Sequence, residues 1–458
     1  MAHRTVAGRE TRQYGVPDTV KEKIEQAAQL FRQGQPREAL EMLRPVTSDA
    51  PGMMRGQTLS ARCWLALGHR DKALDHLATV AGYVDNAPRP ALARANLARF
   101  YAMADEWDEA VSILEVAVSQ EPDNIELKVN HADMLANAGK WREALMIYEA
   151  AVKKFPDNAS LLRSTAISAQ MSKQSTRAVE LYTRTMAAGL TDKLIYSNLI
   201  GALIELGRVD EAHRHASDWC AAMPADIEAM AFMALLEVEV GNCDAAARWF
   251  DFARFVKGHR IEVPEGYGDI DSFNRAIEAV VLGHDRLETP PEDHPTWHHP
   301  ALRIGPEINI DHTGPVGELE KQMRIAVDKY FAESPNDDNH PFLATEPRDY
   351  DIVAWSAVLD GEGNQKPHIH MSGYLSGCYY VTIPGEVSGS GADNAGAFEM
   401  GRPPEELPFR ADFPVETVKP YEGLMLLFPA FMYHGTVPFK SKQKRICVAF
   451  DVIPRRAV

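Results

Sequence analysis

The sequence predicts an α + β protein with two structural parts: an N-terminal α-solenoid of helix pairs and a C-terminal antiparallel β domain of the sandwich or jelly-roll type. Small residues recur with a period of 34 in the first half of the chain, which indicates a repeat array. Short apolar runs alternate with turn residues in the last third, as is typical of antiparallel strands. The length of 458 residues also favours more than one folding unit.

The repeat array is marked by three registers. Two carry alanine and one carries glycine, and neighbouring members lie 34 residues apart, or 37 where an insertion falls at residues 85–88. The glycines indicate the turn that ends a helix, and Asp105 and Lys173 stand at the two exceptions. The registers are Ala27, Ala61, Ala98, Ala132, Ala166, Ile200 and Ala234; Ala39, Ala73, Ala110, Ala144, Ala178, Ala212 and Ala246; and Gly34, Gly68, Gly139, Gly207 and Gly241.

The periodicity places the array at residues 20–258, after an N-terminal tail at 1–19. Residues 259–300 are expected to form a linker or crossing segment, because the stretch ETPPEDHPTWHHP is rich in proline, acid and histidine. Its histidines, His294, His298 and His299, lack the spacing of a metal site. Residues 301–458 then form the second domain, with a helix at 317–332 and about eight strands.

Composition excludes several classes of protein. A net charge of −17 repels a phosphate backbone, so we expect no nucleic-acid partner. No apolar run is long enough to span a membrane, and the N-terminal residues lack the apolar core of a secretory signal, so a cytoplasmic location is expected. The five cysteines form no CxxC pair, which argues against a disulfide framework or a thiolate zinc site.

The C-terminal domain holds a candidate metal site. His368 and His370 stand at i and i+2, so in a strand both side chains point to one face and can contact one ion. His434 follows the buried run LMLLFPAFMY and is expected to meet them from a facing strand. Imidazole ligands suit iron, zinc or copper. Arg445 begins the apolar run RICVAFDV, where an inward guanidinium requires an anion such as a dicarboxylate.

The array resembles seven tetratricopeptide (TPR) repeats. The segment 125–157 fits best, because alanine, glycine, tyrosine and proline stand in the slots that such repeats use. The resemblance implies a right-handed superhelix whose concave groove takes a protein or peptide. The other interpretation is that the array only supports or dimerises the second domain.

The second domain resembles the 2OG-Fe(II) oxygenases of the double-stranded β-helix fold, through KPHIHMSGYLSGCYYVTIP, FEMGRPP, EGLMLLFPAFMYHGTVPF and RICVAFDVIP. The resemblance implies Fe(II) held by His368 and His434, with 2-oxoglutarate and dioxygen as cosubstrates and ascorbate as a reductant. Arg445 would bind the far carboxylate of 2-oxoglutarate, and Tyr380 matches a tyrosine that bonds the same carboxylate in related prolyl hydroxylases. No catalytic side chain beyond the metal ligands is expected.

The second metal ligand departs from the family pattern. That position normally carries aspartate or glutamate, and here it is His370. A site of three histidines, His368, His370 and His434, is the first hypothesis. Alternatively His370 is the first ligand, with Ser372 or water beside it, or Glu399 supplies a carboxylate.

Three functions follow from these expectations. The first is hydroxylation of a protein or peptide that the repeat array recruits. The second is oxidation of a small metabolite, with the repeats serving assembly. The third is a TPR scaffold whose β domain binds metal or carboxylate without turnover.

Overall fold

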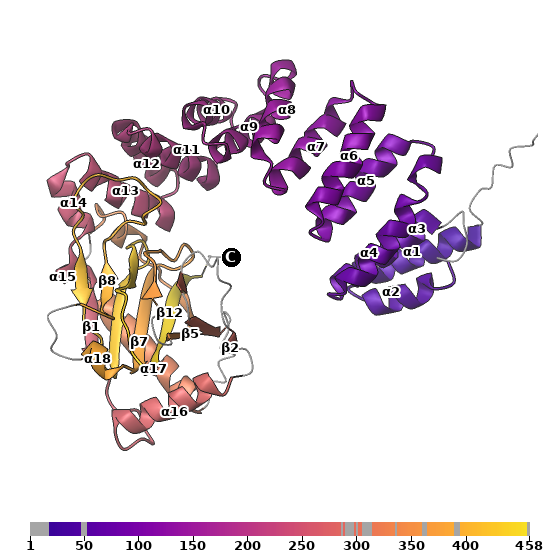
Figure 1. Cartoon of the computed structure of the whole chain (residues 1–458). Coiled ribbons are helices and arrows are strands. Elements are labelled where there is room, and N and C mark those ends of the chain that lie inside the picture. Colours follow the sequence, from indigo (N-terminus) through magenta and orange to yellow (C-terminus); the bar gives the residue numbers. More distant parts are fainter. Residues whose placement is uncertain are drawn as a thin grey trace, which may run out of the picture. The chain divides into compact units, whose positions relative to one another are not determined.

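The computed structural model describes residues 18–46, 53–284, 287–288, 297–298, 301–304, 314–334, 337–359, 364–388 and 394–455. The chain divides into two compact units, Met1–Leu190 and Thr191–Val458. Figure 1 labels many of the elements of both units. Among the helices that the structure describes, none has the length and apolarity needed to cross a membrane.

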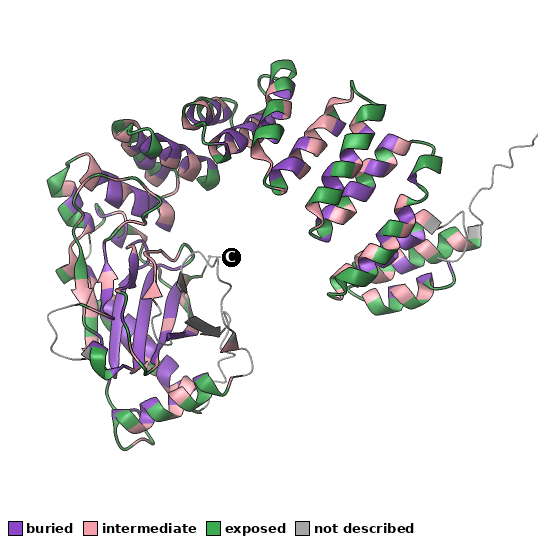
Figure 2. Cartoon of the chain, in the orientation of Figure 1, coloured by how far each residue is buried: buried purple, intermediate pink, exposed green. Residues whose placement is uncertain are grey.

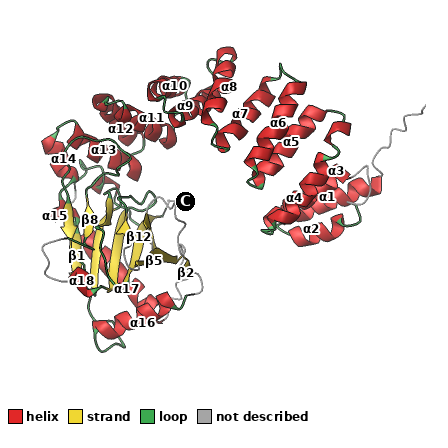
Figure 3. Cartoon of the chain, viewed as in Figure 1, coloured by secondary structure: helices red, strands yellow, loops and turns green. Residues whose placement is uncertain are grey.

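The first unit consists of helix pairs, as the period of 34 predicts (Figure 3). Within this unit the alanines of both registers are fully buried, because a methyl group lets two helix backbones approach closely. Its helices are α1 Asp18–Arg32, α2 Pro36–Leu43, α3 Met53–Ala66, α4 Arg70–Ala81, α5 Pro90–Met103, α6 Trp107–Gln120, α7 Ile125–Asn137, α8 Trp141–Lys154, α9 Ala159–Met171 and α10 Ser175–Ala187, with a 3₁₀ turn at η1 Val84–Asn86.

The turns between paired helices confirm the third register. Gly34, Gly68 and Gly139 have φ of 75–77°. The two exceptions, Asp105 and Lys173, adopt the same left-handed conformation with φ of 57° and 62°. The turn geometry therefore holds even where a side chain makes this conformation unfavourable.

The second unit begins with two more helix pairs: α11 Lys193–Glu205 with α12 Val209–Ala222, and α13 Ile227–Glu239 with α14 Cys243–Trp249. Ile227, Met230 and Trp249 belong to the same apolar core as the β strands that follow. Short elements come next: α15 Phe252–Phe255 and β1 Lys257–Arg260, then α16 Ile270–Leu282. β1 pairs with β10, and α16 packs on the sheet, so these parts of the expected connecting region contribute to the fold of the unit.

The β domain contains antiparallel sheets. The largest has the strand order β1-β10-β7-β12-β5-β4-β2, and a smaller sheet has the order β11-β8-β9. Its strands are β2 Leu287–Glu288, β4 Ala301–Ile304, β5 Tyr350–Leu359, β7 Leu375–Thr382, β8 Phe398–Met400, β9 Glu416–Val418, β10 Leu424–Pro429, β11 His434–Thr436 and β12 Arg445–Pro454; β3 Trp297–His298 pairs with β6 Asn364–Gln365. The remaining helices are α17 Gly314–Glu333, η2 Leu343–Thr345 and α18 Gly385–Ser388.

The two faces of the large sheet have different neighbours. One face packs on α16 and α17 and forms the main apolar core, with Val358, Tyr379 and Val448 among its members. The opposite face meets the small sheet and forms a second core that includes Tyr380, Phe398 and Cys447. Alternate side chains of each strand therefore enter different cores, and the face toward the small sheet is where the candidate site lies. Figure 2 shows these central strands as buried.

Candidate metal centre

His368 and His434 are held opposite each other by the backbone. The amide N–H of each residue donates to the carbonyl oxygen of the other, at 3.0 Å in both directions. Residues paired in this way in an antiparallel ladder present their side chains on the same face. The ring centroids of the two histidines lie 4.4 Å apart.

His370 completes a cluster of three. Its ring centroid lies 5.2 Å from that of His368 and 4.8 Å from that of His434. One ligand-type nitrogen from each ring can be chosen so that all three lie within 4.8 Å of one another. The structure therefore brings together the three histidines that the sequence singled out.

The two paired histidines are oriented by carbonyl groups two residues before them. Nδ1 of His368 lies 2.8 Å from the carbonyl oxygen of Lys366, and Nδ1 of His434 lies 3.0 Å from that of Met432. A carbonyl oxygen only accepts, so each Nδ1 carries the proton and donates. The neutral ring then has its lone pair on Nε2, which is the form that binds a metal ion.

His370 is oriented by a buried carboxylate that the sequence reasoning missed. Nδ1 of His370 lies 2.7 Å from Oδ1 of Asp451, and the hydroxyl of Ser376 donates to the same oxygen at 2.7 Å. Asp451 is only 7% exposed. Asp451 and Ser376 are register partners on β12 and β7. The arrangement is the carboxylate–histidine pair that commonly supports metal-binding imidazoles.

The surroundings of the cluster keep His434 uncharged. Burial, together with the neighbouring rings of His368 and His370, holds the pKa of His434 well below its usual range. Phe398 and Phe428 pack against its ring, with centroid distances of 5.5 and 4.7 Å. A neutral imidazole is available to a metal ion without first losing a proton.

Arg445 is a buried cation at the far end of the same face of β12. It is 1% exposed, and no acidic side chain among the described residues forms an ion pair with it. Its Nε has no hydrogen-bond partner in the part of the chain that the structure describes. A buried charge without a counter-ion is unfavourable, so this guanidinium fits an anionic group.

Tyr380 lies beside Arg445. The guanidinium carbon of Arg445 is 5.2 Å from the centroid of the Tyr380 ring. The phenolic oxygen of this fully buried tyrosine has no hydrogen-bond partner among the described residues. Burial holds the pKa of Tyr380 well above its usual range, so the phenol stays protonated and can donate. Two unpartnered donors side by side fit the carboxylate of a dicarboxylic acid.

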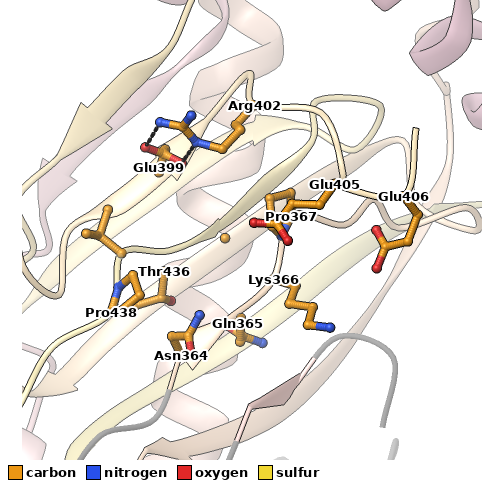
Figure 4. Close-up of a pocket in the computed structure, with 12 residues that line it drawn as sticks. Asn364, Gln365, Lys366, Pro367, Glu399, Arg402, Glu405, Glu406, Thr436 and Pro438 are labelled. Atoms are coloured by element: carbon orange, nitrogen blue, oxygen red, sulfur yellow. Dashed lines mark hydrogen bonds and ion pairs between the residues drawn. The ribbon is translucent and has the colours of Figure 1, made fainter. Parts of the chain in front are cut away.

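Other side chains named from the sequence lie elsewhere. Glu399 precedes Met400, which pairs with His434, and its carboxylate accepts two hydrogen bonds from Arg402, at 2.6 and 2.9 Å (Figure 4). Both residues line a pocket of about 410 Å³ that contains none of the three histidines. Ser372 is exposed and lines a different pocket. Glu399 therefore belongs to an ion pair and not to the histidine cluster.

The remaining residues of interest are the histidines of the linker segment and Trp355. His294 and His299 lie outside the described residues. Trp355 contacts the cluster, because its ring centroid is 5.2 Å from that of His370. Trp355 lies opposite Ala449 on β12, on the face that carries Arg445 and Asp451.

Comparison with known proteins gives the following similarities. Residues 353–451 match the family described as "Putative 2OG-Fe(II) oxygenase". Residues 30–97, 91–115 and 129–190 match tetratricopeptide repeat families. A search of the curated proteins finds no match to this chain.

Several solved structures are similar to parts of the chain. The C-terminal part of a TPR repeat-containing protein from Cytophaga hutchinsonii is 14% identical, with 50% of this chain and 94% of that chain covered and a TM-score of 0.41. A Pseudomonas putida prolyl-4-hydroxylase is 16% identical, with 45% and 96% covered and a TM-score of 0.30. PilW, a type IV pilus biogenesis factor, is 14% identical, with 46% and 96% covered and a TM-score of 0.37. The family matches show that the chain carries tetratricopeptide repeats between residues 30 and 190 and a C-terminal 2OG-Fe(II) oxygenase domain over residues 353–451.

Proposed function

We propose that this protein is an Fe(II)- and 2-oxoglutarate-dependent oxygenase that hydroxylates a protein or peptide substrate. The observation that carries the proposal is the pairing of a preoriented three-histidine cluster with a buried arginine that has no acidic partner among the described residues. The first fits a divalent metal and the second fits a dicarboxylate, and an enzyme of this class requires both.

In this proposal, His368, His370 and His434 hold the iron. Imidazole ligands bring no negative charge to the metal, and the carboxylate of Asp451 lies one hydrogen bond behind His370. Three ligands grouped on one side leave other coordination positions open, as oxygenase chemistry requires.

Arg445 and Tyr380 hold the far carboxylate of 2-oxoglutarate. The guanidinium donates two parallel hydrogen bonds to a carboxylate, and the Tyr380 phenol adds a third donor. When bound, iron and 2-oxoglutarate would supply the oxidising chemistry, by which the substrate, dioxygen and 2-oxoglutarate yield the hydroxylated substrate, succinate and carbon dioxide. The protein orients these groups, and the apolar walls formed by Phe398, Phe428 and Trp355 exclude water.

The repeat array supports a protein or peptide as substrate. Tetratricopeptide repeats present a surface made by successive helices, and such surfaces bind extended chains. A small metabolite as substrate, and a scaffold that binds metal without turnover, are the alternatives that the assay below separates.

The activity is tested with purified full-length protein, Fe(II), ascorbate and 2-oxoglutarate labelled at C1. We expect release of labelled carbon dioxide with succinate, and its loss in His434→Ala and Arg445→Met variants. Stimulation by a peptide pool and not by a metabolite pool supports a peptide substrate, and the reverse result supports the metabolite. Turnover that never exceeds the His434→Ala background with either pool would support the remaining alternative, a scaffold that binds metal without turnover.

The three-histidine ligand set is tested by metal affinity. His368→Ala, His370→Ala and His434→Ala should each lose iron, while Ser372→Ala should bind iron as the unaltered protein does, because Ser372 lies outside the cluster. Full retention of iron by His370→Ala would show that two histidines and another ligand form the site.

A further inference from the structure

The first unit contains a basic groove, by which we mean the surface around Arg55, Arg62 and Arg99. These residues lie on α3 and α5, the first helices of two successive helix pairs. Helix α3 contacts both α1 and α5, so the first helices of three pairs form a continuous surface. A pocket of about 470 Å³ opens on it and is lined by all three arginines.

The arginines face the groove because of their positions in the repeat. Arg62 and Arg99 each follow the buried alanine of the first register, so equivalent positions of neighbouring repeats present the same side chain. Arg55 and Arg62 are seven residues apart on α3 and share one helix face. Asn96, one turn before Arg99, accepts a hydrogen bond from its guanidinium at 3.3 Å.

The charge of this groove is not neutralised within the described part of the first unit. None of the three arginines forms an ion pair there, and Glu25, which also lines the pocket, is paired with Arg32 at 3.2 Å. In the next repeat, Asp133 takes the position equivalent to Arg99 and accepts a hydrogen bond from Tyr148. A local concentration of positive charge therefore stands in a chain whose net charge is −17.

The floor of the groove is apolar. Leu59 and Leu97 are buried and Phe100 is half-buried, and all three line the same pocket as the arginines. Arg62 is fixed beside them, with its guanidinium 4.8 Å from the centroid of the Phe31 ring. A pocket lined by both apolar and cationic side chains suits a ligand that carries both carboxylates and an apolar side chain.

We propose that the basic groove binds an acidic peptide segment in which carboxylate side chains alternate with a leucine or an aromatic residue. The carboxylates pair with Arg55, Arg62 and Arg99, and the apolar side chain lies on Leu59, Leu97 and Phe100. The basic N-terminal residues of this chain, MAHRTVAGRETR, have the wrong charge to be the occupant. The proposal goes beyond the oxygenase function and does not depend on it, because binding needs neither iron nor 2-oxoglutarate.

The experiment uses the full-length protein, without iron, on an array of short peptides. The array combines Glu or Gln at alternate positions with Leu, Phe or Ser between them, and the strongest binders are then measured by fluorescence anisotropy. We expect retention of peptides that carry both Glu and Leu or Phe, and loss when Gln replaces Glu or Ser replaces the apolar residue. Affinity should fall as salt rises, because exposed charges are screened.

A matched pair of variants locates the binding. Arg55→Gln with Arg99→Gln should weaken binding about tenfold, since each exposed ion pair contributes a factor of about two to five. Arg37→Gln with Arg142→Gln removes two exposed charges from the second helices α2 and α8 and should leave the affinity unchanged. Equal affinity for Glu and Gln peptides, or equal effects of the two double variants, overturns the proposal. Tighter binding of double-stranded DNA than of any peptide also overturns it.

Discussion

The carboxylate of Asp451 offers the sharpest test of the site, through the substitution Asp451→Asn. The carboxylate accepts hydrogen bonds from His370 Nδ1 and from Ser376, both at 2.7 Å, in a position that is 7% exposed. Asparagine has nearly the same shape and keeps one acceptor oxygen, so the substitution removes charge and little packing. Metal binding makes Nδ1–H a stronger donor, so the carboxylate stabilises the metal-bound state more than the free state.

The size of the effect follows from these contacts. A hydrogen bond to a charged group contributes about 1.5–3 kcal/mol, and one between neutral groups about 0.5–1.5 kcal/mol. The difference of about 1–1.5 kcal/mol corresponds to about a tenfold loss of metal affinity. This loss lies at the lower end of the range of about 10–100-fold seen when groups that support metal ligands are removed.

The assay is competition between the protein and a chromogenic chelator for Co(II), whose visible absorption reports its coordination, followed by the same titration with Fe(II). Glu399→Gln is the matched control, because Glu399 is a neighbouring carboxylate that is paired with Arg402 instead of with a histidine. Circular dichroism checks that both variants are folded. An affinity of Asp451→Asn within twofold of the unaltered protein, or an equal loss in Glu399→Gln, would refute the reasoning.

Three further predictions concern binding and stability. Arg445→Met should raise the melting temperature of the ligand-free protein, because an unpaired buried charge is removed, and should abolish the additional stabilisation by 2-oxoglutarate; both are read by thermal melts. Gly377→Ala should lower the free energy of unfolding in urea by about 1–3 kcal/mol, because its methyl group would stand 2.1 Å from the Phe450 ring; an unchanged midpoint would contradict this packing. Burial raises the pKa of Asp133 although Tyr148 donates to it, so the folded state loses stability as pH rises through the range between the unfolded and folded pKa. Asp133→Asn should therefore raise the melting temperature at pH 7 and change it little at pH 3, and a constant difference across pH would argue against this cause.

The repeat array could be predicted well from the sequence, because each repeat carries the pattern within its own residues. Each repeat must bury the same small residue, so a period of 34 in alanine is sufficient to place the helix pairs. The same logic identified the turn positions, including Asp105 and Lys173, whose residue types alone would not suggest a left-handed backbone.

The histidine cluster could be predicted in part from the sequence. The carboxylate of Asp451, which orients His370, could not. His368 and His370 are neighbours, and their spacing indicates a shared face in any strand. Asp451 is 81 residues from His370, and only the pairing of β7 with β12 brings it there. The one indication in the sequence was that Asp451 lies inside the apolar run RICVAFDVIP, because a charged side chain that is buried requires a partner.

The strand β1 shows a different limit of sequence analysis. Lys257–Arg260 reads KGHR, which has no apolar alternation, and the sequence placed it at the end of the array. It becomes a strand because its backbone pairs with the edge of β10, and an edge strand needs few apolar side chains of its own.

The reciprocal backbone hydrogen bonds of His368 and His434 bear on how the proposed metal site is assembled. In a zinc finger the ligands converge only as the ion binds, so chelation unfolds the domain. Here the backbone pairing itself holds two of the proposed ligands together, so little conformational entropy would remain to be lost on metal binding. If these histidines hold the iron as proposed, we expect a chelator to remove the metal and leave the fold intact, which circular dichroism before and after chelation would check.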